Sequence, residues 1–283
     1  MALKQGMRLS MTIIGVMLVA GVVFPATLPT ETVVKIGGTG SALGTMVQLA
    51  GAYEKSHPGI RIMIMPSLGS AGAVKAVLGG GIALAIASLP LTETERQQGA
   101  VEVEYARSPF AFITNAKVDK KVVTTHELED IYSGRKSTWP DGSRIRLILR
   151  PEKDIDSRLL RGISPAMDQV VKAAMARPGM IIAITNQEST AAVARTPGAL
   201  GGATLTEVIS EKRPVNILSF NGVQPSVKGI ADRSYPLVKS FYLVTTPKTP
   251  AEARQFAQFA QFVLSPAGRK ILTKNGCLAV GAK

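Results

Sequence analysis

Three loops, each leading from a predicted strand into a predicted helix, carry residue types that bind anions. They read GGTGSA at 37–42, SLGSAG at 67–72 and RPEKDIDS at 150–157. Glycine lets the backbone approach a ligand closely, and the free N–H groups and positive dipole end of a helix start favour negative charge. Arg150 adds a planar fork of donors that suits an oxyanion. Together the three loops predict an anion-binding site.

Ordinary structural roles are the alternatives for the same side chains. Serine and aspartate are common helix caps, so Ser41, Ser70 and Asp156 could each cap the helix that follows. Arg150 could form a salt bridge between two lobes of the protein. The sequence leaves both kinds of role open.

Motifs of enzymes and nucleotide-binding proteins are missing from these loops. Neither Gly-rich loop has the Gly-Lys-Ser/Thr of an NTP-binding loop, the first departs from GxGxxG, and no GxSxG surrounds Ser41 or Ser70. His57 precedes a Pro-Gly turn and His126 starts an acidic HELED segment, so we expect both on the surface. Because no nucleophile–base pair is visible, we expect no enzyme and no cofactor. Two histidines and one cysteine are too few for a His/Cys zinc cluster, so we expect no metal.

Alternating strands and helices must position the loops. The segment TVVKIG at 32–37 alternates like a strand, and IALAIA at 82–87 is the continuous apolar run of a buried parallel strand. Between them we expect a helix at 41–55, a strand at 60–65 and a short helix at 70–78. This order is the βαβ pattern of an α/β fold. Further along we expect a strand at 144–150, helices at 157–163, 166–176 and 189–196, a strand at 235–245 and a helix over 250–264.

The N-terminus resembles an export signal. Lys4 and Arg8 precede an apolar run at 11–24. A short positive region before about 14 apolar residues is typical of a secretory signal, and the run is short for a membrane span, which needs roughly 20 residues. We predict a signal peptide at 1–26, or an uncleaved anchor, because Phe24 stands where a small residue is preferred. Export argues against a nucleic-acid partner, and no aromatic–basic interleaving supports one.

Composition limits the size and the partners of the protein. A chain of 283 residues suits two lobes, and 46% hydrophobic residues are enough for a core. The formal net charge of +13 suits an acidic partner such as a small anion, or describes only a basic surface. With Cys277 as the single cysteine, no intrachain disulfide is possible. We expect Cys277 to be a buried small hydrophobe and Trp139 to anchor a turn by packing.

The most distinctive stretch of the chain is LEDIYSGR at 128–135, followed by TWPDG at 138–142 and by a strand that ends in RPE at 150–152. With the Gly/Ser loops, these segments resemble the phosphate-binding proteins of bacterial ABC importers, the PstS-like periplasmic binding proteins. The resemblance covers most of the chain after about residue 32. Four further segments are similar to the family: ASLPL at 87–91, RTPGALG at 195–201, YPL at 235–237 and LSPAG at 264–268.

The resemblance implies a fold and a division of the chain. The fold is α/β with two lobes, each a mostly parallel sheet flanked by helices, and the ligand lies in the cleft between them. Lobe 1 would combine residues 32–110 with 241–283, and lobe 2 would be residues 111–240. The chain would cross between the lobes near 109–114 and again near 239–245.

The resemblance also implies a set of ligand-binding residues. In the family the anion is held by backbone N–H groups and hydroxyls at helix starts, by one arginine, and by an aspartate that accepts the proton of the anion. Carried over to the matching positions, the expected ligand-binding residues are Thr39, Gly40, Ser41, Ala42, Ser70, Ala71, Ser88, Arg150, Asp156 and Ser157.

Two departures concern the ligand. Ser88 stands where the family motif usually has aspartate, and the usual Ser-Gly-Thr after the arginine is absent. With a small gap Ser157 could replace the threonine, whereas Asp154 and Asp156 lie where small neutral residues are expected. Loss of the aspartate could relax selection against sulfate-like anions, or Asp154 or Asp156 could supply the acceptor from the other lobe. As a third alternative, the pocket binds something else or nothing.

The resulting hypothesis is a periplasmic binding protein that captures a small oxyanion, with phosphate as the leading ligand. We expect a monomer that closes around the anion by a hinge motion and docks on the membrane permease of an ABC importer. The alternative is an envelope protein that uses the same fold for sensing or adhesion, with a different anion or none.

Overall fold

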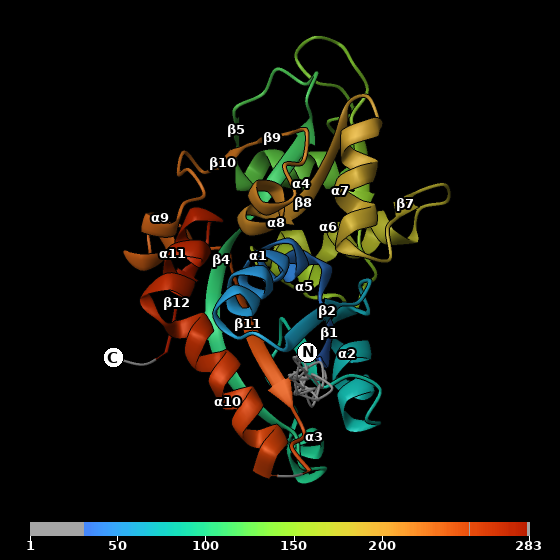
Figure 1. The fold of residues 1–283 in the computed structure, drawn as a ribbon. Coiled ribbons are helices and arrows are strands. Elements are labelled where there is room, and N and C mark those ends of the chain that lie inside the picture. Colours follow the sequence, from blue (N-terminus) through green and yellow to red (C-terminus); the bar gives the residue numbers. More distant parts are fainter. Residues whose placement is uncertain (1–30, 249, 282–283) are drawn as a thin grey trace, which may run out of the picture. The chain divides into compact units, whose positions relative to one another are not determined.

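In the computed structural model, which describes residues 31–248 and 250–281, ten strands form one mixed sheet (Figure 1). Two further strands, β5 (Val122–Val123) and β10 (Ser219–Phe220), pair with each other in parallel. The main sheet has the order β2 (Ile60–Ile64), β1 (Thr32–Gly38), β3 (Leu84–Ala87), β11 (Val238–Thr245), β4 (Val101–Asn115), β8 (Ala199–Thr204), β6 (Arg146–Leu149) and β7 (Ile181–Ile182), with β9 (Val215–Ile217) and β12 (Leu278–Ala279) added on β4.

The long strand β4 joins two halves of this sheet. Its first part pairs antiparallel with β11 as far as Pro109, and from Phe110 onward it pairs antiparallel with β8. Away from β4 the pairs are parallel: β1 with β2 and β3 in one half, and β6 with β7 and β8 in the other. The predicted boundary between the lobes, after residue 110, lies beside this change of partner and stays a prediction.

Helix α1 shows why the first half folds as the sequence predicts. It spans Gly40–Ser56 and buries Met46, Leu49 and Tyr53, which lie one turn apart on one face. These side chains pack on Ile36, Ile86 and Phe241 from three strands. The other helices here are α2 (Gly69–Leu78), α3 (Glu93–Gln97), α10 (Pro250–Leu264) and α11 (Pro266–Lys274).

The second half has its own core, and Trp139 lies within it. Trp139 is 3% exposed, and its indole N–H donates to the carbonyl oxygen of Gly198 at 3.0 Å. The expected packing role of Trp139 is therefore confirmed, as is the burial of Cys277 in the first half. The helices here are α4 (Thr125–Ser133), α5 (Ile155–Arg161), α6 (Pro165–Ala176), α7 (Asn186–Arg195), α8 (Leu205–Ser210) and α9 (Val227–Ala231).

The mixed α/β architecture is confirmed, and the differences from the predicted elements are local. The predicted helix at 157–163 begins earlier, as α5, and the one at 189–196 begins at Asn186, where Thr185 and Glu188 form a capping box. Strand β8 was not predicted, because its glycines hide the strand pattern. The predicted signal peptide lies outside the described residues. Within them, no helix combines the length and the apolar character that a membrane crossing requires.

Candidate binding site

The three predicted loops meet around one cavity of about 510 Å³. The loops after β1 and β3 and the start of α2 line it from one half of the sheet. The loop after β6, the start of α5 and the start of α7 line it from the other. Ligands of α/β sheets bind at the carboxyl ends of parallel strands, and this cavity lies where two such sets of strand ends face each other. We call it the cleft.

Half of the predicted residues line the cleft and half lie behind its wall. Those in the wall are Thr39, Ser70, Ala71, Ser88 and Arg150. Those outside the lining are Gly40, Ser41, Ala42, Asp156 and Ser157, and all five are buried.

Ser70 and Ser88 form a pair in the cleft. Their hydroxyl oxygens lie 2.8 Å apart, and the backbone N–H of Ser88 donates to Ser70 Oγ at 2.9 Å. The N-cap of α2 is Leu68, with no side-chain cap bond, so the interpretation of Ser70 as a plain helix cap is wrong. The first N–H groups of a helix have no hydrogen-bond partner within the helix. Ser70 belongs to the first turn of α2, so the Ser70–Ser88 pair lies beside these free N–H groups.

The start of α1 is covered by the second half of the protein. Gln187 Nε2 donates to the carbonyl oxygen of Gly40 at 2.9 Å, and Thr204 Oγ1 donates to that of Ser41 at 3.1 Å. Glycine at position 40 leaves room for this side chain, because a Cβ there would lie 1.9 Å from Gln187 Oε1. The N-cap of α1 is Thr39, so Ser41 is not the cap either. Its hydroxyl lies 2.9 Å from that of Thr39.

Arg150 is 5% exposed and partly engaged by its own surroundings. Nη1 donates to the carbonyl oxygen of Ala183 at 2.6 Å, and Nη2 donates to Asp154 Oδ2 at 2.8 Å. Nε lies 3.6 Å from Asp156 Oδ2 and has no hydrogen-bond partner among the described residues. Both carboxylates follow Arg150 within six positions of the chain, so these ion pairs join it to its own loop and helix.

The two aspartates have different surroundings. Asp154 lines the cleft and is the N-cap of α5, accepting the N–H of Asp156 at 2.9 Å. Asp156 therefore is not the cap. It is 1% exposed, with Oδ1 accepting from Lys239 Nζ at 2.6 Å and Oδ2 accepting from Asn186 Nδ2 at 2.8 Å. Ser157 stays behind the wall, where its hydroxyl donates to the carbonyl oxygen of Arg150 at 3.0 Å.

Lys239 and Asn186 are site residues that the sequence reading missed. Lys239 is 1% exposed on β11, where Lys239 and Phe241 are buried and alternate with the half-buried Val238, Ser240 and Tyr242. Period-2 alternation in the predicted strand would have placed this lysine on the buried face, and a buried lysine needs a partner. Asn186 Oδ1 also accepts from Thr39 Oγ1 at 3.4 Å, so its amide links the loop after β1 to Asp156.

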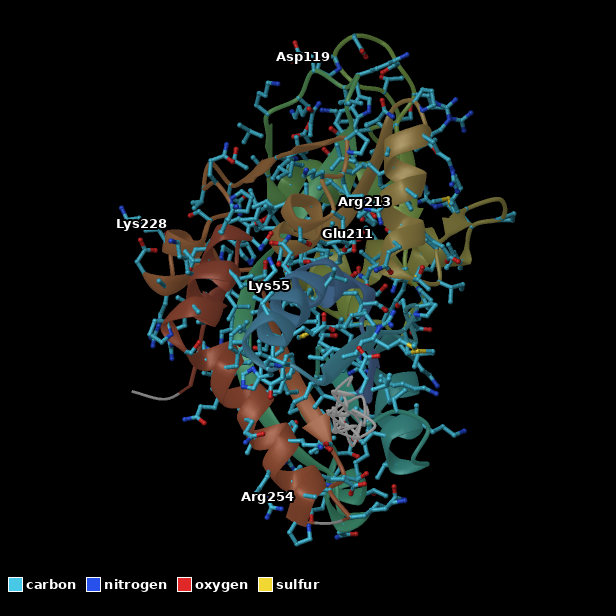
Figure 2. All side chains as sticks on the ribbon, viewed as in Figure 1. Lys55, Asp119, Glu211, Arg213, Lys228 and Arg254 are labelled. Atoms are coloured by element: carbon cyan, nitrogen blue, oxygen red, sulfur yellow. The ribbon has the colours of Figure 1, made fainter. Side chains whose placement is uncertain are left out.

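Burial raises the pKa of two carboxyl groups near the cleft. The pKa of Asp154 is raised by desolvation and then by the charge of Asp156, while Arg150 and Lys239 oppose the shift. Glu207 lies on α8, which packs against α1. Desolvation raises the pKa of Glu207 to about 7, and the charge of Glu211 adds to the shift. Glu211 is itself paired with Arg213 just after α8 (Figure 2).

The balance of charge in the cleft is positive. Its lining holds Arg150, Lys153 and Arg158 against the single carboxylate of Asp154. Behind the lining, Lys239 and Asp156 neutralise each other. A net positive cleft with hydroxyls and helix N–H groups can hold a small anion. Within the described residues, no group of three or more His, Cys, Asp or Glu side chains is placed to hold a metal ion.

A mixed sheet whose two halves face each other across a polar cleft defines a two-lobe solute-binding protein of the α/β class. Residues 25–267 match the family model described as the PBP superfamily domain, and the chain belongs to that family.

Relatives and solved structures agree with this assignment. The chain is 25% identical over 261 residues to the phosphate-binding protein PstS of Borreliella burgdorferi, covering 88% of this chain and 91% of the relative. It is 22% identical to the PstS of Bacillus subtilis, covering 87% and 80%. A phosphate-bound putative phosphate ABC transporter substrate-binding protein of Clostridium perfringens shares the fold, with a TM-score of 0.72, 23% identity and coverage of 88% of this chain and 100% of that one.

Proposed function

We propose that the protein is a substrate-binding protein of an ABC importer that captures a small oxyanion, with phosphate as the leading ligand. The relatives named above bind phosphate by name, and the cleft of this chain has the charge to do the same. The single observation that carries the proposal is that the guanidinium of Arg150 and the Ser70–Ser88 hydroxyl pair line one cavity at the start of α2.

The anion would bind without a chemical step. Its oxygens would accept from the hydroxyls of Ser70 and Ser88, from the N–H groups at the start of α2, and from Arg150. Hydrogen bonds between a charged group and an anion are stronger than those between neutral groups. The remaining basic excess is spread over separate elements, as Lys55, Lys228 and Arg254 show (Figure 2), and would raise the anion concentration near the protein at long range.

Capture for import implies a location and a partner. We propose that the mature chain works outside the cytoplasm, in the periplasm, and delivers its ligand as a monomer to a membrane permease. The chain's membership of a binding-protein family supports this, as does the export signal that the sequence predicts at 1–26.

Calorimetry of the mature chain against phosphate, sulfate and molybdate tests the proposal. We expect tight binding of at least one anion and a loss of at least about 100-fold in Arg150→Ala, because a buried charged hydrogen bond and its geometry are removed. Arg146→Ala is the matched control, since Arg146 lies on the same strand outside the cleft and donates to the carbonyl oxygen of Pro197.

Arg150→Ala leaves Asp154 without its cation and Asp156 with Lys239 alone, and it can unfold the chain. Arg150→Lys keeps the charge and removes the fork, so it serves as the second variant, with its folding checked by thermal unfolding. Retained affinity in both variants would refute the role of Arg150. No binding of any anion to the folded wild-type chain would refute the proposed function.

A further inference from the structure

The cleft is larger than a bare oxyanion needs. A tetrahedral oxyanion has five heavy atoms, and even at the volume of one water molecule per atom it fills no more than about 150 Å³. The cleft measures about 510 Å³, within the range of about 300–1,000 Å³ that small organic ligands use. More than half of its volume is therefore available to a second part of the ligand.

The cleft is also lined by apolar side chains from both halves of the sheet. Leu68, 44% exposed, precedes α2, and Ile184, 67% exposed, precedes α7. Leu89 and Ile155, both half-buried, line the same cavity. Single exposed apolar residues are common on protein surfaces, but four that line one cavity form an apolar rim. We call these four residues the rim.

The polar end of the cleft is separate from the rim in kind. Ser70, Ser88 and Arg150 line the cleft with hydroxyl and guanidinium donors. This end suits a dianionic head group. The rim offers no charge and suits the part of a ligand that the head group carries.

We propose that the ligand is an organic phosphate monoester or phosphonate with a short apolar substituent, whose head binds at Ser70, Ser88 and Arg150 and whose substituent packs on the rim. This inference rests on the proposed function and narrows its ligand class. Inorganic phosphate fills the polar end alone, so it binds more weakly than the substituted anion.

Calorimetry with inorganic phosphate, methyl phosphate, n-butyl phosphate and n-butylphosphonate tests this. Each methylene buried on the rim strengthens binding about fourfold, so n-butyl phosphate is expected to bind at least about tenfold tighter than methyl phosphate. The comparison of n-butyl phosphate with n-butylphosphonate tells a monoester from a phosphonate. In the double variant Leu68→Ser/Ile184→Ser, the ratio between the butyl and methyl affinities falls to near one.

Met63→Ser is the matched control. Met63 is 40% exposed on β2 and does not line the cleft, so this variant keeps the wild-type ratio. Inorganic phosphate binding tighter than every substituted anion would overturn the inference and leave the proposed function standing. Binding of neither inorganic phosphate nor any substituted anion would overturn both.

Discussion

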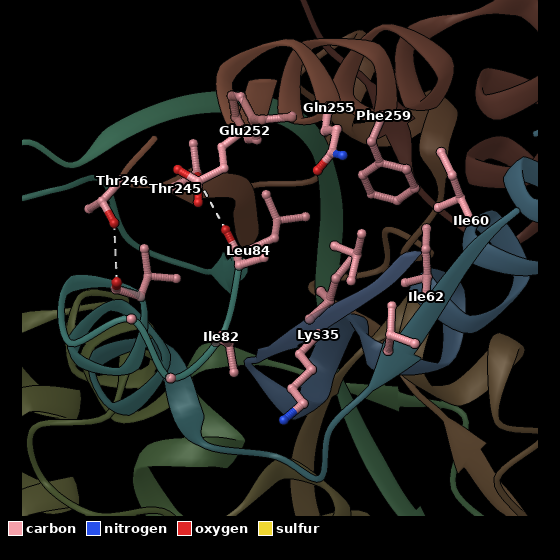
Figure 3. Close-up of a pocket in the computed structure, with 18 of the residues that line it drawn as sticks. Lys35, Ile60, Ile62, Ile82, Leu84, Thr245, Thr246, Glu252, Gln255 and Phe259 are labelled. Carbon is pink, nitrogen blue, oxygen red and sulfur yellow. Dashed lines mark hydrogen bonds between the residues drawn. The ribbon is translucent and has the colours of Figure 1, made fainter. Parts of the chain in front are cut away.

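Two cavities in the described part of the chain lie at opposite ends of strands β1 and β3 and differ in the polar groups that line them. The cleft lies at the carboxyl ends of β1 and β3 and measures about 510 Å³. The other, of about 380 Å³, is lined by residues from the start of β1 and β2, the segment before β3 and α10 (Figure 3). We call it the edge cavity.

Two polar side chains of the edge cavity donate hydrogen bonds to the backbone. Thr245 Oγ1 donates to the carbonyl oxygen of Ala83 at 3.0 Å, and Thr246 Oγ1 donates to that of Val77 at 3.1 Å (Figure 3). Most of the remaining wall is apolar, with Ile60, Ile82 and Phe259 among its members. In the cleft, by contrast, a buried guanidinium and two hydroxyls face a space that the chain does not fill. The kind of donor group that lines a cavity, more than its volume, indicates where an anion binds.

The largest expected effect is on the buried ion pair behind the cleft. Lys239→Met removes the ammonium group that lies 2.6 Å from Asp156 Oδ1 and leaves a buried carboxylate with less compensation. We expect the free energy of unfolding to fall by about 3–5 kcal/mol in a urea titration. Asp156→Asn in the same chain should recover part of the loss, since the unpaired charge is then gone.

Lys35→Met is the matched control at the edge cavity. Lys35 is exposed and lines that cavity, so its replacement should change the free energy of unfolding by less than about 0.5 kcal/mol. Equal losses in both lysine variants would remove the contrast between the two cavities.

A second experiment tests whether the edge cavity affects only the stability of the core and not the binding of the anion. Phe259 is 5% exposed and packs edge-on against Tyr53, with ring centroids 5.2 Å apart. Phe259→Ala should lower the free energy of unfolding by about 3 kcal/mol and leave the affinity for the anion unchanged. Gln255→Ala, on the exposed face of the same helix, should change neither. A loss of anion affinity in folded Phe259→Ala would connect the two cavities.

A third experiment uses pH to detect the buried carboxyl behind α1. Burial raises the pKa of Glu207 to about 7 in the folded chain, and the charges of Glu211 and Asp156 add to the shift. Lys239 and the hydrogen bond that Thr190 donates at 3.0 Å oppose the shift. In the unfolded chain the ordinary pKa of Glu207 is near 4.5, so the unfolded state loses the proton first as pH rises. Stability should therefore fall between these two values and level off above them.

Urea titrations at pH 5 and pH 8 measure this fall. Over that interval, the free energy of unfolding of the wild-type chain should fall by up to about 3 kcal/mol more than that of Glu207→Gln, at about 1.4 kcal/mol per pH unit. Parallel pH profiles for the two chains would show that Glu207 ionises normally in the fold.

Local sequence patterns predicted the loops of the cleft, but they could not predict contacts between segments that are distant in the chain. The Gly/Ser loops at 37–42 and 67–72 and the arginine at 150 were found because strand–turn–helix signals lie within a few residues. Gln187 over Gly40 and Lys239 against Asp156 join positions that lie far apart in the chain, and no local signal pairs them.

The start of α5 shows how a small error in a boundary changes a site. The sequence predicted a helix from 157 with Asp156 as a possible cap, but the helix begins two residues earlier and Asp154 caps it. This offset moves Asp156 into the wall, against Lys239, and leaves Asp154 as the carboxylate that lines the cleft. Helix ends are set by such cap contacts, which single-sequence patterns locate only to within a few residues.

The smallest expected effect concerns the carboxylate of Asp154, and it gives the most direct information about the ligand. Asp154 accepts from Arg150 Nη2 at 2.8 Å, so an anion must compete with it for the guanidinium. Asp154→Asn removes one negative charge from the cleft wall and should strengthen anion binding about tenfold, or about 1.4 kcal/mol. Glu152→Gln is the matched control, because Glu152 lies on the same loop with its side chain 65% exposed and outside the lining.

The pH dependence gives this prediction its direction. Because the pKa of Asp154 is raised, its carboxylate takes up a proton at a higher pH than an ordinary aspartate, and the neutral acid resembles the asparagine variant. The affinity gap between wild type and Asp154→Asn should therefore narrow as pH falls, and the titration of the anion itself cancels in that comparison. If Asp154→Asn instead binds more weakly at every pH, Asp154 accepts a proton from the ligand and takes over the task of the aspartate that Ser88 replaces.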